Sequence, residues 1–409
     1  MIIRARTVVT MNGPPIDNGA VAVSGDRIAA VGTFDQLKGQ TPGPVMDLGE
    51  QVLLPGLINA HCHLDYTAFR GRIPAKKSFS EWVGAINAEK AKFSPEDYLR
   101  SIRNGVADAQ RFGTTSIVNL EAFPELASQI ESVLRIWWFA ELIDVRAPES
   151  AGDLIDSAVQ ALKYNKHWGL APHSLYTGSH RLYEKCQEVA AREKVLLSTH
   201  VAESADEMAM FRDASGPLYQ FLQSIRRDVT DCGNETPLAR FLRVSMEQEA
   251  VMKNQNISRW IVAHLNELDR TDFALLKKME TKFHLVHCPR SCLYFGHARF
   301  AFEQLRQLGF NICLGTDSLA SKDDLSLFAE MQQFREKYSG VSCREIVEMV
   351  TVNPARALGQ VNRLGQIGED FCADLIAIDT GGQGDVFENI AGHQGPVNWI
   401  MVGGLPLGA

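Results

Sequence analysis

Residues Leu57-Ile58-Asn59-Ala60-His61-Cys62-His63 form an apolar run that ends in two histidines separated by one residue. In an extended strand, side chains at positions i and i+2 point to the same side, so both imidazoles can reach one ion. The pair alone is equally compatible with two solvated histidines or with two histidines satisfied inside a core. Its place at the end of a strand decides its meaning, because other strands of the chain end in the same way.

Seven further apolar runs of strand length follow this stretch, and segments with helical spacing separate them. Residues 94–111 are expected to form one of these helices, since they open with Ser-Pro-Glu as a capped first turn does, and residues 180–194 another. Eight strands that alternate with helices predict a (β/α)8 TIM barrel, although a doubly wound parallel sheet shows the same alternation. The seven runs are 115–120, 135–142, 168–172, 195–200, 260–264, 283–288 and 312–315.

The two ends of the chain follow a different pattern, with short β runs punctuated by glycines. Near the N-terminus these are residues 20–23 and 27–31, and near the C-terminus residues 373–378 and 399–402. We expect both ends to pair into one small β-sandwich domain. The predicted division is residues 1–53 plus 362–409 for this domain, and 54–361 for the barrel.

Composition narrows the classes of partner. The 409 residues are 45% hydrophobic, enough for a sizeable core, and carry a formal net charge of -8. An acidic chain has no standing affinity for nucleic acid or for an anionic membrane, so we expect a small-molecule substrate. Because no stretch of about 18 apolar residues or signal-like run occurs, and the eight cysteines form no CxxC pair, we expect a reduced, cytoplasmic protein. A homodimer is the candidate assembly.

Other strand runs also end in groups that can bind a metal or move a proton. The fifth run ends at His200, the sixth at His264, and the eighth at Asp317. Barrel enzymes build their sites from the C-terminal ends of their strands, so these three side chains should converge with His61 and His63. The sequence therefore predicts one site at one mouth of the barrel.

This set of motifs resembles the amidohydrolase superfamily, and the resemblance covers nearly the whole chain. It implies that His61, His63, His200 and Asp317 hold a metal, and that His264 contacts the attacking water or the substrate. The motifs are Leu54-Pro55-Gly56-Leu57-Ile58-Asn59-Ala60-His61-Cys62-His63, Gly113-Thr114-Thr115, Leu314-Gly315-Thr316-Asp317, Asn353-Pro354-Ala355-Arg356-Ala357-Leu358-Gly359 and Ala373-Asp374-Leu375.

The resemblance also implies how many metal ions the site takes. Binuclear relatives carry a modified lysine at the end of strand four, where this chain has Ala171-Pro172-His173. One divalent ion is therefore expected. Neutral imidazoles with one carboxylate suit zinc or iron(II), and the sequence does not choose between them.

Glu203 follows His200 by three residues, as in the purine and pyrimidine deaminases of this superfamily. Deamination requires that a ring nitrogen be protonated while hydroxide attacks the carbon that bears the amine, and a carboxylate can carry that proton. We expect Glu203 to do this, with Asp317 accepting the proton of the water and His264 polarising the developing charge. The alternative, a solvated glutamate on the following helix, suits Glu207 better.

Further residues are expected to contact the substrate. His173 matches the strand-four loop of nucleoside-type deaminases, while Phe79 and Trp82, in a loop after strand one, can cover a flat ring. Glu141 at the end of strand three either binds sugar hydroxyls or pairs with Arg146. Where the family usually has asparagine after the serine of strand seven, this chain has Cys292, which puts the local loop geometry in doubt.

These features favour a metal-dependent deaminase of an adenine-type nucleoside, such as aminodeoxyfutalosine, adenosine or an S-adenosylhomocysteine-like compound. Guanine, pterin and triazine aminohydrolases share the metal ligands and stay as alternatives. A cyclic-amide hydrolase of the imidazolonepropionase type would use the same activated water to open a ring, which releases no ammonia directly. A non-enzymatic barrel that has lost its ligands is disfavoured, because every expected ligand is present.

Overall fold

The computed structural model describes residues 1–40, 43–74, 78–246, 257–379, 381 and 384–407. Its central region is a parallel sheet whose strands follow one another in chain order. Each apolar run of the sequence forms one of these strands, within one or two residues at its ends. The strands are β6 (Leu57–His63), β7 (Thr114–Glu121), β8 (Arg135–Leu142), β9 (Trp168–Pro172), β10 (Leu196–Val201), β11 (Trp260–His264), β12 (His284–His287), β13 (Asn311–Leu314) and β14 (Asp317–Ser318).

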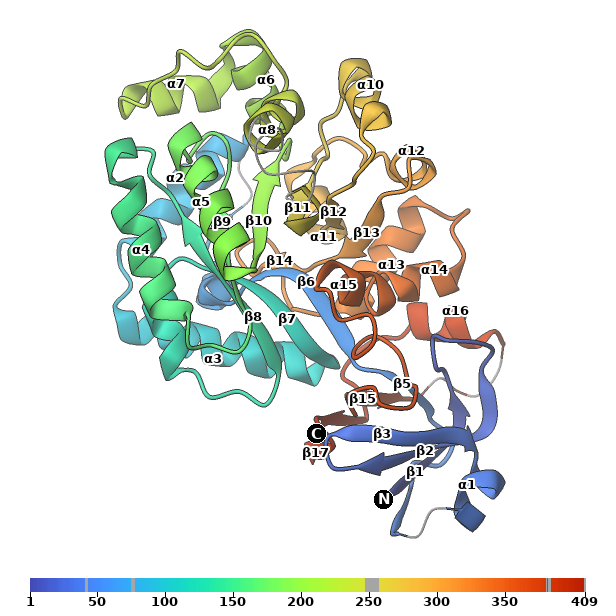
Figure 1. Cartoon of the computed structure of the whole chain (residues 1–409). Helices are drawn as coiled ribbons and strands as arrows, with labels where there is room; N and C mark the ends of the chain where they lie inside the picture. The colour runs from blue at the N-terminus through green and yellow to red at the C-terminus, as the bar shows by residue number, and fades with distance from the viewer. Residues whose placement is uncertain (41–42, 75–77, 247–256, 380, 382–383, 408–409) are drawn as a thin grey trace.

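The sheet closes on itself. Strand β14 continues the direction of β13 after two residues and pairs in parallel with β6, so that Asp317 lies beside Cys62 and Ser318 beside His63. The first and last strands of the sheet are thereby joined, and Figure 1 shows helices around the outside. The fold is a (β/α)8 barrel, which excludes the doubly wound sheet that the sequence pattern also allowed.

The helices lie between these strands. Helix α3 is preceded by Ser94, whose side chain accepts a hydrogen bond from the Asp97 main chain in a capping box. Both helices that the sequence predicted are present, as α3 and α5. The helices are α1 (Phe34–Gln40), α2 (Phe79–Lys90), α3 (Pro95–Arg111), α4 (Ala151–Leu162), α5 (His180–Glu193), α6 (Ala205–Asp213), α7 (Gly216–Ser224), α8 (Pro237–Met246), α10 (Arg270–Lys278), α11 (Pro289–Phe295), α12 (Phe302–Gln307), α13 (Leu327–Lys337), α14 (Cys343–Glu348), α15 (Val352–Ala357) and α16 (Val386–Ala391).

The two chain ends form a second sheet beside the barrel, visible in Figure 1 where blue and red strands lie together. The N-terminal strand β5 pairs in antiparallel fashion with the C-terminal strand β15, with Leu53 opposite Ala377. This confirms that the two ends pair into one β domain. Its eight strands are linked by hydrogen bonds into one continuous sheet. The strands are β1 (Ile2–Val8), β2 (Ile16–Ser24), β3 (Arg27–Thr33), β4 (Val45–Asp47), β5 (Val52–Pro55), β15 (Leu375–Ile378), β16 (Trp399–Val402) and β17 (Leu405–Leu407).

An ion pair joins the two sheets. Arg135, the first residue of β8, donates hydrogen bonds from Nε and Nη2 to the two carboxylate oxygens of Asp374, at 2.7 and 3.1 Å. Asp374 directly precedes β15 and also accepts a hydrogen bond from the main chain of Gly403. A bidentate pair of this kind fixes the orientation of the two side chains as well as their distance. It therefore holds the small sheet against the end of the barrel where strand β8 begins.

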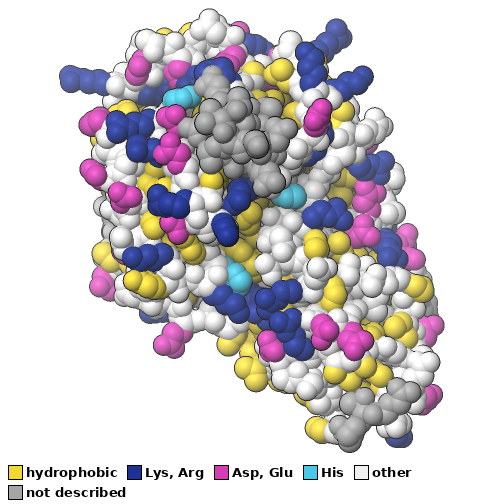
Figure 2. Space-filling view, viewed as in Figure 1, with side chains coloured by type: hydrophobic (Ala, Val, Ile, Leu, Met, Phe, Trp, Pro, Cys, Tyr) yellow, Lys and Arg dark blue, Asp and Glu magenta, His cyan; other side chains and the backbone are white. Residues whose placement is uncertain are grey.

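The surface carries both signs of charge. On the face drawn in Figure 2, Lys and Arg side chains are interspersed with Asp and Glu side chains. No helix within the described ranges is long and apolar enough to cross a membrane.

Candidate active site

Three histidines meet inside the barrel. His61 and His63 project from the end of β6, and His200 from β10, and each offers a ring nitrogen within 4.8 Å of the others. Asp317 completes the group, since its Oδ1 atom lies 3.9 Å from His61 Nε2 and 3.8 Å from His63 Nε2. Two ligands of one zinc-like ion lie roughly 3.4 Å apart in a tetrahedral site, so small shifts would bring these atoms to that spacing.

The chemistry of the donors also fits a metal. Neither ring nitrogen of His61, which is fully buried, has a hydrogen-bond partner among the described residues. Burial lowers the pKa of His61 well below its usual value and lowers the pKa of His63 as well, so both rings are neutral. Neutral imidazole is the form that binds metals, and an orphaned buried nitrogen is costly without such a partner.

Backbone geometry constrains the group around His61, Asp317 and His264. Gly315 lies against His61, and a Cβ atom built on it would stand 2.8 Å from His61 Cβ and 2.9 Å from His61 N. Only glycine permits this approach. Asp317 and His264 have φ angles of 55° and 77°, in the left-handed region that costs energy for residues other than glycine. Such strain is typical of functional sites.

A second layer of contacts orients the proposed ligands. His200 Nδ1 lies 2.7 Å from the main-chain oxygen of His173, and Ser291 Oγ donates a hydrogen bond of 2.5 Å to Asp317 Oδ2. Glu141 Oε1 lies 3.6 Å from His63 Nδ1. No ion pair joins Glu141 to Arg146 among the described contacts, and Glu141 instead lines the same cleft as the histidines.

Glu203 stands beside this group on the loop after β10. Its Oε1 atom lies 3.7 Å from His264 Nε2, and its main chain is fixed by a 3.1 Å hydrogen bond that Asn266 donates to its carbonyl. Its amide donates to Glu207 Oε2 at 2.8 Å. The expectation that Glu207 is solvated was wrong: this side chain is fully buried at the start of α6, and burial raises its pKa to about 8.

The proposed substrate contacts line one cleft with the histidines. The cavity in this cleft has a volume of about 130 Å³ and opens to solvent. One face of α2 covers it. The sequence predicted that Phe79 and Trp82 lie in a loop, and this was wrong. Both residues belong to α2, because Ser78 caps a helix that starts at Phe79. Their rings stack with centroids 6.2 Å apart.

His173 lies in the cleft after β9. Its Nδ1 atom is within 3.0 Å of the Ser174 hydroxyl and 2.8 Å of the Thr177 hydroxyl, which leaves Nε2 toward the cleft. The structure brings together the ten residues that the sequence placed at the site: His61, His63, Phe79, Trp82, Glu141, His173, His200, Glu203, His264 and Asp317.

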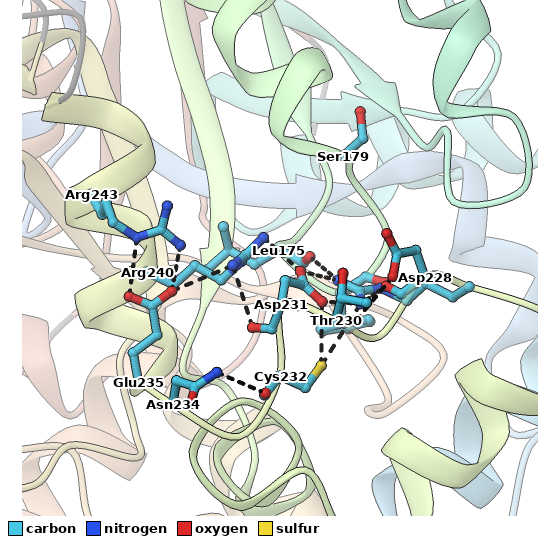
Figure 3. Close-up of polar contacts among 12 residues, drawn as sticks. Leu175, Ser179, Asp228, Thr230, Asp231, Cys232, Asn234, Glu235, Arg240 and Arg243 are labelled. Atoms are coloured by element: carbon cyan, nitrogen blue, oxygen red, sulfur yellow. Dashed lines mark hydrogen bonds and ion pairs between the residues drawn. The ribbon is translucent and has the colours of Figure 1, made fainter.

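An ion-pair network braces the loop that carries His173. Arg227 donates hydrogen bonds to the main-chain oxygens of Leu175 and Tyr176 at 3.1 and 3.0 Å, and its guanidinium binds both oxygens of Asp231. Figure 3 shows Asp231 held in turn by Arg240, which lies beside Glu235. Because Arg227 and Arg240 are almost fully buried, this network fixes the loop that carries His173.

The sequence reasoning missed four residues of the site. Lys90 and Phe295 line the cleft, and Tyr66 stacks on His63 while its hydroxyl lies 2.5 Å from Lys90 Nζ. His297 faces Glu203. The spacing of Phe79, Trp82, Ile86 and Lys90 at three to four residues was the signal for a helix face over the site, whereas nothing in the sequence around residue 297 marks it.

Comparison with known proteins gives the family. The profile of the amidohydrolase family matches residues 52–404, and that of an imidazolonepropionase-like composite domain from bacteria matches residues 19–40 in the small sheet. A 5-methylthioadenosine/S-adenosylhomocysteine deaminase from Syntrophobacter fumaroxidans is 28% identical over 90% of this chain and 81% of its own.

Two solved structures share the fold over 99% of this chain. Helicobacter pylori aminofutalosine deaminase in complex with methylthio-coformycin superposes with a TM-score of 0.84 at 21% identity, over 99% of its chain. An adenosine deaminase from Xanthomonas campestris with bound zinc superposes with a TM-score of 0.80 at 24% identity, over 92% of its chain. With the histidine and aspartate donors at the barrel mouth, these matches show that the chain belongs to the amidohydrolase family and is a hydrolytic enzyme acting on carbon–nitrogen bonds.

Proposed function

We propose that this enzyme hydrolytically deaminates adenine-type nucleosides with the help of one divalent metal ion. One observation carries the proposal: a carboxylate, Glu203, stands beside the His264 imidazole at the edge of a metal-binding histidine group, under a cover of flat aromatic side chains. The resemblance to 5-methylthioadenosine/S-adenosylhomocysteine deaminases over 90% of the chain supports this substrate class.

The metal ligands in this proposal are His61, His63, His200 and Asp317, and the ion is zinc or iron(II). The unpartnered nitrogens of His61 support this assignment, as do the short distances from both β6 histidines to Asp317. A second cluster, Glu141 with His173 and His200, is less suitable because it shares His200 with the first set and would leave both ring nitrogens of His61 without a partner. A divalent ion bound by the first set would lower the pKa of a bound water to about 7 and would so supply a nucleophile at neutral pH.

The protein's own residues then move the protons. Glu203 gives a proton to the ring nitrogen while the oxygen of water bonds to the carbon that bears the amine, and Asp317 takes the proton from that water. Asp317 passes its proton to the amine, the carbon–nitrogen bond breaks and ammonia leaves. The second proton of the former water returns to Glu203 as the carbonyl forms. His264 Nε2, held near Glu203 by its strained backbone, stabilises the charge that develops on the oxygen.

The rest of the cleft suits a nucleoside. Phe79, Trp82 and Phe295 offer ring faces and edges within 6.2 Å of one another for a flat base. Glu141 and the free edge of His173 offer polar contacts for sugar hydroxyls. The proposal also takes residues 54–361 as the catalytic domain, residues 1–53 with 362–409 as the small one, and the cytoplasm as the location.

The decisive experiment is an ammonia-release assay of the metal-loaded enzyme. The substrates are adenosine, 5′-methylthioadenosine, S-adenosylhomocysteine and aminodeoxyfutalosine, with guanine, a pterin and an imidazolone as contrasts. We expect one ammonia per nucleoside consumed. Ammonia release from guanine or the pterin alone would contradict the proposed substrate class. Turnover of the imidazolone without ammonia would establish ring opening instead of deamination.

The Glu203→Gln variant is the matched control, because it keeps the shape of the side chain and removes its ability to transfer a proton. We expect its metal content to match that of the wild type and its kcat to fall by at least about a hundredfold. A variant that works at the normal rate would remove Glu203 from the mechanism.

A further inference from the structure

A second imidazole faces the carboxylate of Glu203. His297 Nε2 lies 3.9 Å from Glu203 Oε1, the same oxygen that lies 3.7 Å from His264 Nε2. The His297 side chain is only 5% exposed, and its Nε2 atom has no hydrogen-bond partner in the described part of the chain. A buried donor without a partner is costly, which calls for a reason for its presence at this place.

The ring of His297 is held rigidly. Helix α11 ends at Gly296, whose φ of 66° reverses the chain, and the His297 amide donates a 3.0 Å hydrogen bond to the Cys292 carbonyl. The imidazole stacks on Phe295 with centroids 5.2 Å apart and meets the edge of Phe79 at 5.8 Å. Both aromatic residues also line the proposed binding cleft for the base. The side chains that would contact the base therefore also fix the orientation of the His297 ring toward Glu203.

The Cys292 side chain supports the same turn. Its Sγ atom donates a weak hydrogen bond of 3.5 Å to the main-chain oxygen of Ala298, on the other side of His297. The cysteine and the histidine thus belong to one local structure, in which residues 292 and 298 fix the backbone on either side of the imidazole.

We propose that His297 is a positioning residue for Glu203: its Nε2–H donates to Oε1 and thereby directs Oε2 to the ring nitrogen of the substrate. The terminal torsion of a glutamate is broad, so a carboxylate with no donor would sample many orientations. A neutral imidazole has one donor nitrogen to restrict it. The present 3.9 Å is longer than a hydrogen bond, as is common for catalytic contacts before substrate binds. This inference rests on the proposed function of Glu203.

The first test does not depend on turnover. In protein labelled with ¹⁵N-histidine, the His297 Nε2 resonance is assigned from its loss in His297→Leu. We expect the wild-type resonance to shift when Glu203 is replaced by Leu and to stay in place when His167, which stacks on Trp137 at the other end of the barrel, is replaced by Leu. If the chemical shift of His297 Nε2 does not change in Glu203→Leu, the proposal is overturned.

The second test uses kinetics. We expect His297→Leu to lower kcat about tenfold with KM within about twofold, and His297→Gln, which keeps a donor nitrogen, to recover most of that loss. In the Glu203→Gln background, His297→Leu should change kcat by less than about twofold, since the residue acts through Glu203. His167→Leu serves as the control for loss of a stacked histidine.

The outcomes separate the two proposals. Equal losses in His297→Leu and His297→Gln would show that packing alone matters, and a full tenfold loss in the Glu203→Gln background would show that His297 acts elsewhere; either result refutes the positioning role. If the wild type releases no ammonia from any nucleoside, the proposed function fails, and the NMR comparison still decides whether His297 binds Glu203.

Discussion

The Nδ1 atom of His200 lies 2.7 Å from the main-chain oxygen of His173. The contact places the proton of the ring on Nδ1 and leaves the lone pair of Nε2 for a metal. Because the partner is a main-chain atom, His173→Ala should keep about one equivalent of metal while losing substrate affinity, whereas His200→Ala should lose most of its metal. Elemental analysis of the two purified variants checks this, and equal metal loss in both would contradict it.

Gly315 should be needed for metal binding although it has no donor atom. An alanine there would place its Cβ within 2.9 Å of the main chain of His61, which has no space to move inside the barrel. We expect Gly315→Ala to lower metal affinity at least about tenfold, as measured by competition with a chelator. Gly340→Ala is the matched control, because its Cβ would meet no atom within 4 Å. Similar affinities in the two variants would show that His61 has room to adjust.

Trp82 should control substrate affinity more than rate. It lines the cleft from α2 and contacts the Phe295 ring edge to face at 4.9 Å. Losing an aromatic contact worth about 1.4 kcal/mol would raise KM about tenfold, so we expect that for Trp82→Ala, with kcat within about threefold. Trp82→Phe keeps a ring face and should stay within about threefold of the wild type. If kcat falls and KM does not, the ring takes part in catalysis instead.

The ion-pair network around Arg227 should contribute to the stability of the fold and should hold the loop that carries His173. Its side chain is 8% exposed, and its guanidinium binds Asp231 and two main-chain oxygens. Replacing it by methionine leaves buried acceptors unpaired, which costs about 3 kcal/mol of unfolding free energy. Arg243, at 43% exposed in the same network, should cost less than about 1 kcal/mol when replaced by methionine. Chemical denaturation of both variants gives the comparison, and equal losses would argue against a buried brace.

Glu207 should make the enzyme less stable as the pH rises. Burial raises its pKa in the folded state to about 8 from the ordinary value of 4.5. Between these values the folded state holds a proton that the unfolded state has lost. The contribution of Glu207 to stability is therefore most favourable below pH 4.5 and declines as the pH rises to 8, by up to about 1.4 kcal/mol per pH unit. Glu207→Gln removes this titration. We will see this in the free energy of unfolding of the metal-loaded proteins between pH 5 and 8, where that of the variant should rise relative to that of the wild type. A constant difference across this range would contradict the raised pKa.

Much of the fold could be predicted from the sequence because its strands are fully buried on both faces. Such strands read as continuous apolar runs, and the runs at 135–142 and 168–172 match β8 and β9 residue for residue. Barrel closure could not be predicted in this way, since it depends on β14, a strand of two residues that has no apolar pattern of its own.

The site could be predicted where residues sit at strand ends. His63, His200 and Asp317 lie at or next to the C-terminal ends of barrel strands, so their place at one mouth of the barrel does not depend on the conformation of the loops. The misses lie on helices and turns. The Phe79 and Trp82 segment appeared to be a loop because the α2 helix has only a weak separation of apolar and polar faces, and His297 reaches the site only through the turn at Gly296.

The hydrogen bonds between Asn59 and Thr316, residues 257 positions apart, lie next to both the seam of the barrel and the metal donors. The ion would therefore span the first and the last strand of the sheet, so that its release weakens the seam and opening of the seam releases it. Metal affinity and resistance to unfolding should then be two measurements of one equilibrium, and a chelator should expose the seam amides to hydrogen exchange before those of any other strand pair.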